Sequence, residues 1–241
     1  MLTDRVILVT GSAKRVGRGI ALRLAQEGAR VAIHYGQSAE DARATAKECN
    51  NAPVFQADLT KVDEIIRLFD EVHAHFGRID GLVNNAARFT RFDPLAIKES
   101  DWDFIHDVNL KAVFFCCQQA AKHMIDDSNG GRIVNISSLG GIKPWAWHAH
   151  YCASKAGVIH LTRALAKAFA PHKITVNSVA PGVIEFGDRP PAERVAKMIA
   201  QTPAGRSGTP AEIADAVAYF MNATNFVTGQ LLTIDGGLGL R

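Results

Sequence analysis

The 241-residue sequence has little cysteine, little net charge and no long uncharged apolar run, and each of these excludes a class of protein. The net charge is only +3 and Lys and Arg are scattered, so nothing points to a nucleic-acid partner. No uncharged apolar stretch reaches the roughly 18 residues of a membrane span, and the first residues lack the pattern of a signal peptide. The four cysteines show no CxxC pair and no metal-ligand spacing: Cys49, Cys116, Cys117 and Cys152. We therefore expect a cytoplasmic protein with reduced thiols and no metal site.

Short apolar runs alternate with segments of helical periodicity along the whole chain. Strands are predicted at residues 5–10, 30–35, 53–57, 79–83, 131–136, 173–179 and 230–234. Helices are predicted at 16–27, 38–49, 61–76, 101–124, 150–169 and 210–221, with a polar helix in the segment after 190. Each parallel crossover needs a covering helix, so this order predicts a seven-stranded parallel sheet with helices on both faces. No linker or repeat interrupts it, and we predict one α/β domain over residues 1–241.

A glycine-bearing turn connects the first predicted strand to the first predicted helix. In an α/β sheet this is where the pyrophosphate of a dinucleotide binds, on backbone N–H groups at the start of the helix. The turn residues expected to bind cofactor are Gly11, Ser12, Lys14, Arg15, Val16 and Gly17. Such a turn can also carry glycine for conformational reasons alone. Asp58, after the third strand and before Leu59, suits the adenine amino group and equally suits a helix cap.

Tyr151 and Lys155 are four residues apart on a predicted helix, so their side chains share one face. Ser138 lies at the end of the fifth predicted strand, the edge at which parallel sheets bind ligands. A tyrosine with its ordinary pKa near 10 is a poor acid–base group at neutral pH, and a neighbouring ammonium lowers that pKa. Each residue alone has an ordinary explanation, and the combination predicts proton transfer to or from a substrate oxygen.

Taken together, these motifs resemble the short-chain dehydrogenase/reductase family over nearly the whole chain. The matching stretches are TGSAKRVG at 10–17, AD at 57–58, NNA at 84–86, VN at 108–109, NISS at 135–138, YCASK at 151–155, PG at 181–182 and VTGQLLTIDGG at 227–237. The resemblance implies a single-domain, doubly wound Rossmann-type fold. It also implies a homodimer or homotetramer, with the helices near 101–124 and 150–169 forming a bundle between subunits.

The resemblance assigns roles to individual residues. Tyr151 would be the acid/base, Lys155 would bind the nicotinamide ribose and lower the tyrosine pKa, and Ser138 would orient the substrate carbonyl. Asn109 would hold a water in a proton relay. Residues along the cofactor would also include Asn85, Ala86, Ala87, Pro181, Gly182, Val183 and Ile184. Because the hydride chemistry belongs to the nicotinamide cofactor, the protein residues would position the reactants and polarise the carbonyl.

The end of the second predicted strand favours NADP(H) over NAD(H). Relatives that prefer NAD carry an acidic residue there, and this chain has Tyr35. Without that carboxylate nothing repels a 2′-phosphate, and Lys14 and Arg15 could pair with it. Ser38 and Gln37 could add hydrogen bonds. The same two cations could instead be solvated.

Three traits also resemble the pteridine reductase branch of the family, namely Arg15 in place of a turn glycine, Ala87 in place of the last glycine of NNAG, and Phe89. Ser138 stands where that branch carries a carboxylate, and a serine suits a carbonyl. We therefore predict an NADPH-dependent reductase of a ketone, including a 3-oxoacyl group. The alternatives are a pteridine reductase and a non-catalytic nucleotide-binding sensor.

Two further segments are expected near the substrate. Trp145 and Trp147 lie between Ser138 and Tyr151, where they could line a pocket or pack at a subunit interface. Residues 185–205 occupy the position of a substrate lid, and Phe186 in it is expected to contact substrate. The nine histidines have no carboxylate partner at a metal spacing and are expected in the core or in solvent.

Overall fold

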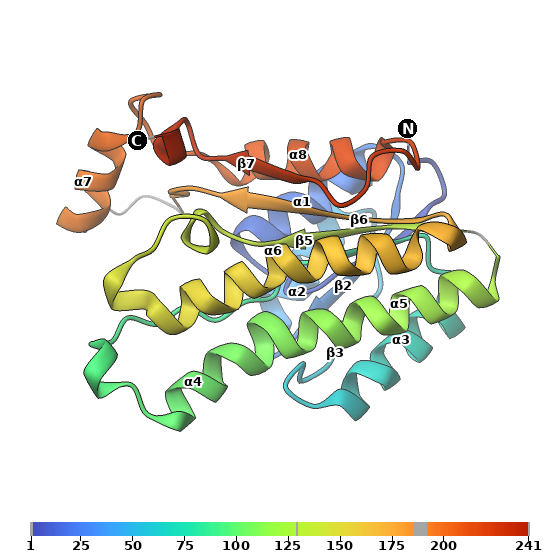
Figure 1. Cartoon of the computed structure of the whole chain (residues 1–241). Helices are drawn as coiled ribbons and strands as arrows, with labels where there is room; N and C mark the ends of the chain where they lie inside the picture. Colours follow the sequence, from blue (N-terminus) through green and yellow to red (C-terminus); the bar gives the residue numbers. More distant parts are fainter. Residues whose placement is uncertain (1, 129, 186–191, 241) are drawn as a thin grey trace.

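The computed structural model of the protein describes residues 2–128, 130–185 and 192–240. Its seven strands form one parallel sheet in the order β3-β2-β1-β4-β5-β6-β7 (Figure 1). The strands are β1 Val6–Val9, β2 Arg30–Tyr35, β3 Val54–Gln56, β4 Gly81–Asn84, β5 Gly131–Ile136, β6 Ile174–Pro181 and β7 Leu231–Ile234. This confirms the predicted Rossmann-type α/β fold.

Helices cover both faces of the sheet. They are α1 Arg15–Gln26, α2 Ala39–Glu48, α3 Val62–Phe76, α4 Glu99–His106, α5 Ala112–Asp126, α6 Ala149–Phe169, α7 Glu193–Gln201 and α8 Pro210–Asn222. In Figure 1, α3, α5 and α6 lie along one side of the strands, while α1, α2 and α8 lie behind them.

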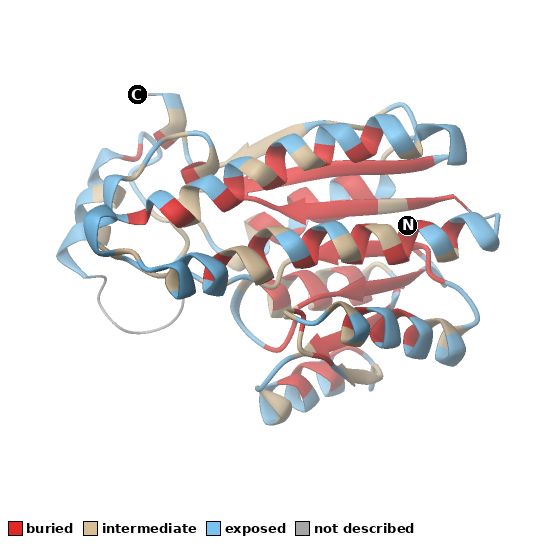
Figure 2. Cartoon of the chain, turned by 60° about the horizontal axis from the view of Figure 1, so that its bottom comes forward, coloured by how far each residue is buried: buried red, intermediate tan, exposed pale blue. Residues whose placement is uncertain are grey.

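The two faces have separate hydrophobic cores, which follows from the alternation of side chains along each strand. In β1, Ile7 and Val9 pack with α1, α2 and α8, whereas Val6 and Leu8 pack with α3, α5 and α6. All four are at most 1% exposed. Figure 2 shows the buried strands between helices whose outer faces are exposed. A parallel sheet covered on both faces needs continuous apolar strands, which explains why these runs were visible in the sequence.

The helix predicted at residues 101–124 is not continuous. α4 ends at His106, a π-helical segment spans Asp107–Lys111, and α5 begins at Ala112. A π turn adds a residue to the helix and changes which side chains face inward. Here it buries Val108 and Asn109 completely or almost completely.

The strand order reverses at β1, whose neighbours are β2 and β4. The chain leaves these strands in opposite directions along the sheet, so a crevice opens at their carboxyl ends. The glycine turn after β1, the Asn84–Asn85–Ala86 segment after β4 and Ser138 after β5 all lie at this edge.

Candidate active site

Helix α6 and the end of β5 bring together three predicted catalytic residues. Lys155 is 3% exposed, and its Nζ donates a hydrogen bond of 2.8 Å to the Ile136 carbonyl. The same Nζ lies 5.9 Å from the centre of the Tyr151 ring. Ser138 shares a hydrogen bond with the Tyr151 side chain, and its Oγ accepts from the Gly140 N–H at 3.0 Å. Because Ser138 Oγ accepts from the backbone, its own hydrogen is available to another acceptor.

Burial acts on the two titrating groups in opposite directions. It raises the pKa of Tyr151 to about 12, and the hydrogen bond with Ser138 only partly opposes it. It lowers the pKa of Lys155 to about 8. Desolvation of the phenolate is the larger effect on the Tyr151 pKa in this structure, and the lowering of that pKa by Lys155 stays a prediction. At neutral pH Tyr151 is a protonated donor beside a largely cationic lysine.

Asn109 is 0% exposed and holds the segment that follows β4. Its Oδ1 accepts from the Arg88 N–H at 2.7 Å, and its Nδ2 donates to the Arg88 carbonyl at 2.9 Å. The Nδ2 also donates to the Ser154 hydroxyl at 3.3 Å. The side chain thus joins the π segment to the loop carrying Phe89 and to α6, and its role toward a water stays a prediction.

The glycine turn is packed against the end of β4. A Cβ at Gly17 would lie 2.3 Å from the Gly11 carbonyl oxygen, and one at Gly11 would lie 2.9 Å from Ala86 Cα. The Asn85 amide donates to the Thr10 and Gly11 carbonyls at 3.0 Å. Glycine at positions 11 and 17 is therefore required by close packing as well as by the φ of +62° at Gly11.

His34 supports this turn, a role that the sequence analysis did not predict. Its Nδ1 accepts from the Gly11 N–H at 3.0 Å, and its Nε2 lies 3.2 Å from the Ala57 carbonyl, to which it donates. Burial lowers the pKa of His34 to about 4, so the ring is neutral, as both contacts require. The sequence analysis placed the histidines only in the core or in solvent. The available signal was a polar residue inside an otherwise apolar strand.

The start of α1 is suited to an anion. No side chain caps its N-terminus, and no acidic residue lies in its first turn. The first N–H groups of a helix lack internal partners, and the helix dipole favours negative charge there. These residues therefore fit the phosphates of a dinucleotide. The Ser12 hydroxyl is fully buried and accepts from the His34 N–H at 3.0 Å, so only the Ser12 backbone faces the turn.

The predicted partners of a 2′-phosphate lie near the end of β2. Lys14 Nζ forms an ion pair of 2.8 Å with Asp41, and both side chains are about half exposed. Arg15 is exposed and has a φ of +53°, a left-handed conformation that suits the glycine usual at this place. Tyr35 and Ser38 are half-buried at the same edge, and Ser38 makes no capping bond to α2.

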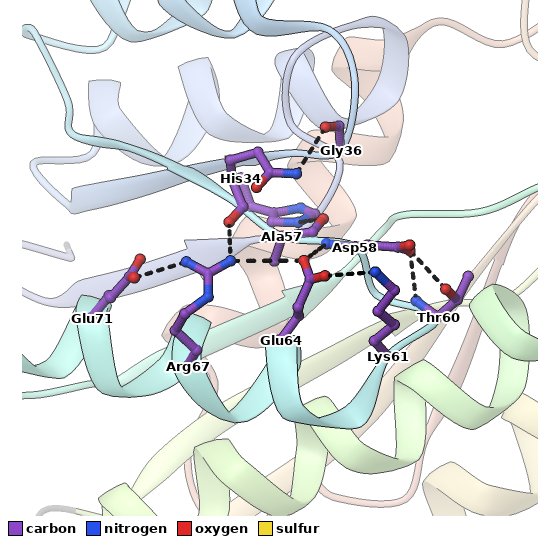
Figure 3. A network of polar contacts seen from close by, with 10 residues as sticks. His34, Gly36, Ala57, Asp58, Thr60, Lys61, Glu64, Arg67 and Glu71 are labelled. Atoms are coloured by element: carbon purple, nitrogen blue, oxygen red, sulfur yellow. Dashed lines mark hydrogen bonds and ion pairs between the residues drawn. The ribbon is translucent and has the colours of Figure 1, made fainter.

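The segment after β3 carries Asp58 in a polar network (Figure 3). Asp58 Oδ1 accepts from the N–H and hydroxyl of Thr60, and these bonds lower the pKa of Asp58. The Asp58 N–H donates to Glu64 at 2.7 Å, while Glu64 pairs with Lys61 and Arg67. Both predicted uses of Asp58 remain compatible, since it organises the turn before α3 through one oxygen. Leu59 beside it is buried.

A cavity of about 260 Å³ lies beside Tyr151. It is lined by Phe89, Trp145, Ala146, Trp147, His148, Gly182, Val183, Ile184, Arg194, Val195 and Met198. Three predicted substrate residues and three predicted cofactor residues thus line one space. The Phe89 and Trp145 rings lie 4.7 and 6.3 Å from the Tyr151 ring. Pro181 is half-buried at the end of β6 and Ala87 is exposed, while Phe186 lies outside the described residues.

Helix α7 closes one side of this cavity. The sequence analysis did not predict its contact with the opposite wall. Arg194 Nη1 lies 2.8 Å from His148 Nε2. Arg194, Val195 and Met198 lie on one face of α7 at helical spacing, which was the available signal. Beyond the helix, Gly208 bridges to Ile184 and its N–H donates to the Val183 carbonyl at 2.9 Å.

Within the described ranges, no group of three or more His, Cys, Asp or Glu side chains could hold a metal ion. The four cysteines are free thiols, and all but Cys152 are buried. Among the helices that the structure describes, none has the length and apolar character needed to cross a membrane.

Comparisons with known proteins agree with this geometry. A family model described as enoyl-(acyl carrier protein) reductase matches residues 11–239. The chain is 40% identical to a 3-oxoacyl-acyl-carrier-protein reductase of Staphylococcus aureus, over 99% of each chain. It is 38% identical to the 2-dehydro-3-deoxy-D-gluconate 5-dehydrogenase of Escherichia coli, over 98% of this chain and 96% of the relative.

Solved structures give the same result. A mutant short-chain dehydrogenase/reductase of Serratia marcescens superposes with a TM-score of 0.92 at 35% identity, covering 99% of both chains. Acetoin dehydrogenase from Enterobacter cloacae superposes with a TM-score of 0.91 at 32% identity, covering 99% of this chain and 97% of the other. The protein therefore belongs to the short-chain dehydrogenase/reductase family, nicotinamide-dependent oxidoreductases that act on CH–OH and C=O groups.

Proposed function

We propose that the protein is an NADPH-dependent reductase that converts a ketone to an alcohol, with 3-oxoacyl groups among the candidate substrates. The observation that carries this proposal is the convergence of Tyr151, Ser138 and the buried Lys155 beside one cavity. The Staphylococcus aureus relative, a 3-oxoacyl reductase by name, supports the substrate class.

The residues have distinct roles in this proposal. When bound, the reduced nicotinamide supplies the hydride that adds to the carbonyl carbon. Ser138 donates its hydroxyl hydrogen to the carbonyl oxygen and so fixes its position, and Tyr151 gives its phenolic proton to that oxygen as the alcohol forms. The Lys155 ammonium stabilises the resulting phenolate, which then recovers a proton from solvent. Asn109 positions Ser154 and the loop that carries Phe89.

Reduction of a panel of ketones and 3-oxoacyl thioesters, followed by NADPH oxidation, tests the reaction. We expect Tyr151→Phe to lower kcat by at least about 100-fold, since general acid catalysis contributes about 10²–10⁴-fold. Tyr219→Phe, an exposed tyrosine on α8, is the matched control. A panel with no substrate for either NADPH or NADH would overturn the proposal.

The preference for NADP(H) is part of the same proposal. It is supported by Tyr35 at the end of β2 and by Lys14 and Arg15 in the turn. Because Asp41 neutralises Lys14, we expect Asp41→Asn to lower the KM for NADPH several-fold without lowering that for NADH. Tyr35→Asp should raise the KM for NADPH selectively. Equal effects on both cofactors would contradict the preference.

Pteridine reduction is the second candidate, carried by Phe89 in the cavity and Arg15 in the turn. It would require turnover of dihydrobiopterin or dihydrofolate above that of every ketone. The third candidate, a sensor that binds nucleotide without catalysis, would show tight NADPH binding and no turnover of any compound.

We also propose that the protein acts as a homodimer or homotetramer. Large apolar side chains on α4 and α5 are more than a third exposed, namely Trp102, Phe104, Phe114 and Ile125. An apolar surface of this kind is typical of an interface. The family resemblance implies a helix bundle between subunits, built from the helices near 101–124 and 150–169.

A further inference from the structure

The described lining of the cavity beside Tyr151 carries one fixed charge. Among the residues that the structure describes, Arg194 is the only lining residue that is always ionised, and none of these lining residues is acidic. Two described acidic side chains that are close in sequence to the cavity residues have other partners: Glu193 pairs with Lys197, and Glu185 accepts from Ser207. Apart from Arg194 and His148, the lining is apolar or aromatic side chains and glycine.

The Arg194 guanidinium is held in place by a neutral group. His148 is 1% exposed, and its Nδ1 lies 2.8 Å from the Thr90 carbonyl, to which it donates. Its Nε2 is therefore left as an acceptor for Arg194 Nη1 at 2.8 Å. Burial and the nearby Arg194 charge both lower the pKa of His148, which keeps the ring neutral. The histidine thus orients the guanidinium without cancelling its charge.

A second cation adds to the positive potential of the same wall. The Arg91 guanidinium lies 5.0 Å from the Trp147 ring, on a side chain that lines the cavity. The Phe89 ring stacks on His148 at 4.6 Å and touches Tyr151 edge-on at 4.7 Å. A ligand whose reacting carbonyl meets Tyr151 would therefore pass Phe89 and reach Arg194 with its far end.

We propose that the natural substrate carries a carboxylate as well as the carbonyl that is reduced, on an apolar or aromatic body, and that Arg194 binds this carboxylate. The proposal rests on the carbonyl reductase function above. An arginine with a neutral partner, in a cavity whose described lining is otherwise apolar and carries no acid, favours a planar anion that accepts two N–H bonds. His148 is the positioning residue for the guanidinium.

Matched acids and methyl esters test this. The probes are 2-oxo-2-phenylacetate, 4-oxo-4-phenylbutanoate and 5-oxo-5-phenylpentanoate, each beside its methyl ester, with NADPH oxidation giving kcat/KM. We expect at least one acid to exceed its ester by about tenfold or more, mainly through KM. Arg194→Met should reduce this acid-to-ester ratio about 10- to 100-fold, as expected for a charge-assisted contact.

The ratio separates recognition from a structural effect. A loosened α7 would slow acid and ester alike, whereas loss of the anchor affects the acid only. Arg194→Lys should retain part of the preference, since it keeps the charge and loses the fork. Lys197→Met removes an exposed cation from the same helix and should leave the ratio unchanged.

The outcomes distinguish this inference from the function on which it rests. Reduction of esters with no preference for any acid, or a ratio unchanged in Arg194→Met, overturns the inference alone. If no probe and no ketone is reduced, the proposed function falls. Binding measured by tryptophan fluorescence in the presence of NADP⁺ then tests whether Arg194 binds a carboxylate. We expect 4-phenylbutanoate to bind at least tenfold more tightly than 4-phenylbutanamide, and this difference to be lost in Arg194→Met. Equal binding of the two overturns it.

Discussion

Tyr151 and Lys155 share one buried environment and respond to it in opposite ways. Desolvation disfavours both the phenolate and the ammonium, so it raises the pKa of Tyr151 to about 12 and lowers that of Lys155 to about 8. The lysine, not the tyrosine, is therefore the group of this pair that titrates near physiological pH.

The activity should depend on the charge of Lys155. Below pH 8 the ammonium is present to stabilise the phenolate formed when Tyr151 gives up its proton; above it the charge is lost. We expect kcat/KM for reduction to be level below about pH 8 and to fall up to about tenfold per pH unit above it. Stopped-flow NADPH oxidation from pH 6 to 10 measures this. A level profile up to pH 10 would contradict the assignment.

His34 should make the fold sensitive to acid. Its pKa is about 4 in the folded protein and 6.5 in the unfolded chain, so the two states bind protons equally only well above pH 6.5. As the pH falls from 6.5 to 4, only the unfolded chain gains the proton, and the folded state loses about 3 kcal/mol. Urea unfolding across this range, by circular dichroism, measures the loss.

His34→Gln is the matched variant for that experiment. A glutamine can accept from Gly11 and donate to Ala57 but does not titrate. Its free energy of unfolding should therefore change less between pH 6.5 and 4 than that of the wild-type protein. An identical pH dependence in both would show that another group is responsible.

The site residues that could be predicted from the sequence are those whose positions follow from spacing within one helix or strand. Tyr151 and Lys155 are four apart on one helix, and Ser138 ends a strand, so their convergence follows from the fold. The contacts of His34 with Gly11 and of Arg194 with His148 join residues 23 and 46 positions apart. Their partners depend on packing between elements, which no spacing in one sequence encodes.

Among the secondary-structure elements, too, local patterns were predictable and features that depend on packing were not, as the π segment between α4 and α5 shows. The strands were predictable because both faces of the sheet are covered and their apolar runs are continuous. The break in the helix could not be predicted, because the apolar periodicity of residues 101–124 continues through it. The π turn is accompanied by a contact outside the helix, the pair of hydrogen bonds between Asn109 and the Arg88 backbone.

Asn109→Ala should therefore destabilise the fold. It leaves the Arg88 N–H and carbonyl without their partner, and a buried unsatisfied backbone group costs about 1–3 kcal/mol. We expect a loss of about 2–4 kcal/mol in the free energy of unfolding for the two groups together. Asn225→Ala, in the exposed segment after α8, is a surface control. A loss no larger than that of the control would contradict the positioning role.

At the scale of the whole molecule, the exposed face of α4 and α5 predicts association. Phe114→Glu places a charge on this face, where burial in an interface would leave it unpaired. We expect the molar mass measured by light scattering after gel filtration to fall, and Lys47→Glu, at an exposed lysine of α2, to leave it unchanged. A monomeric wild-type protein would contradict the proposed oligomer.

The sheet ends on one side at β7, and this edge has a consequence for handling the protein. Leu231–Ile234 is an apolar strand of half-buried residues paired to β6 on one side only. The row of backbone groups on its other side is a template for a further strand, and such edges promote aggregation when left uncovered. This edge should therefore favour precipitation when the protein is concentrated, and a charged residue in place of the half-buried Leu231 would be the first remedy to try.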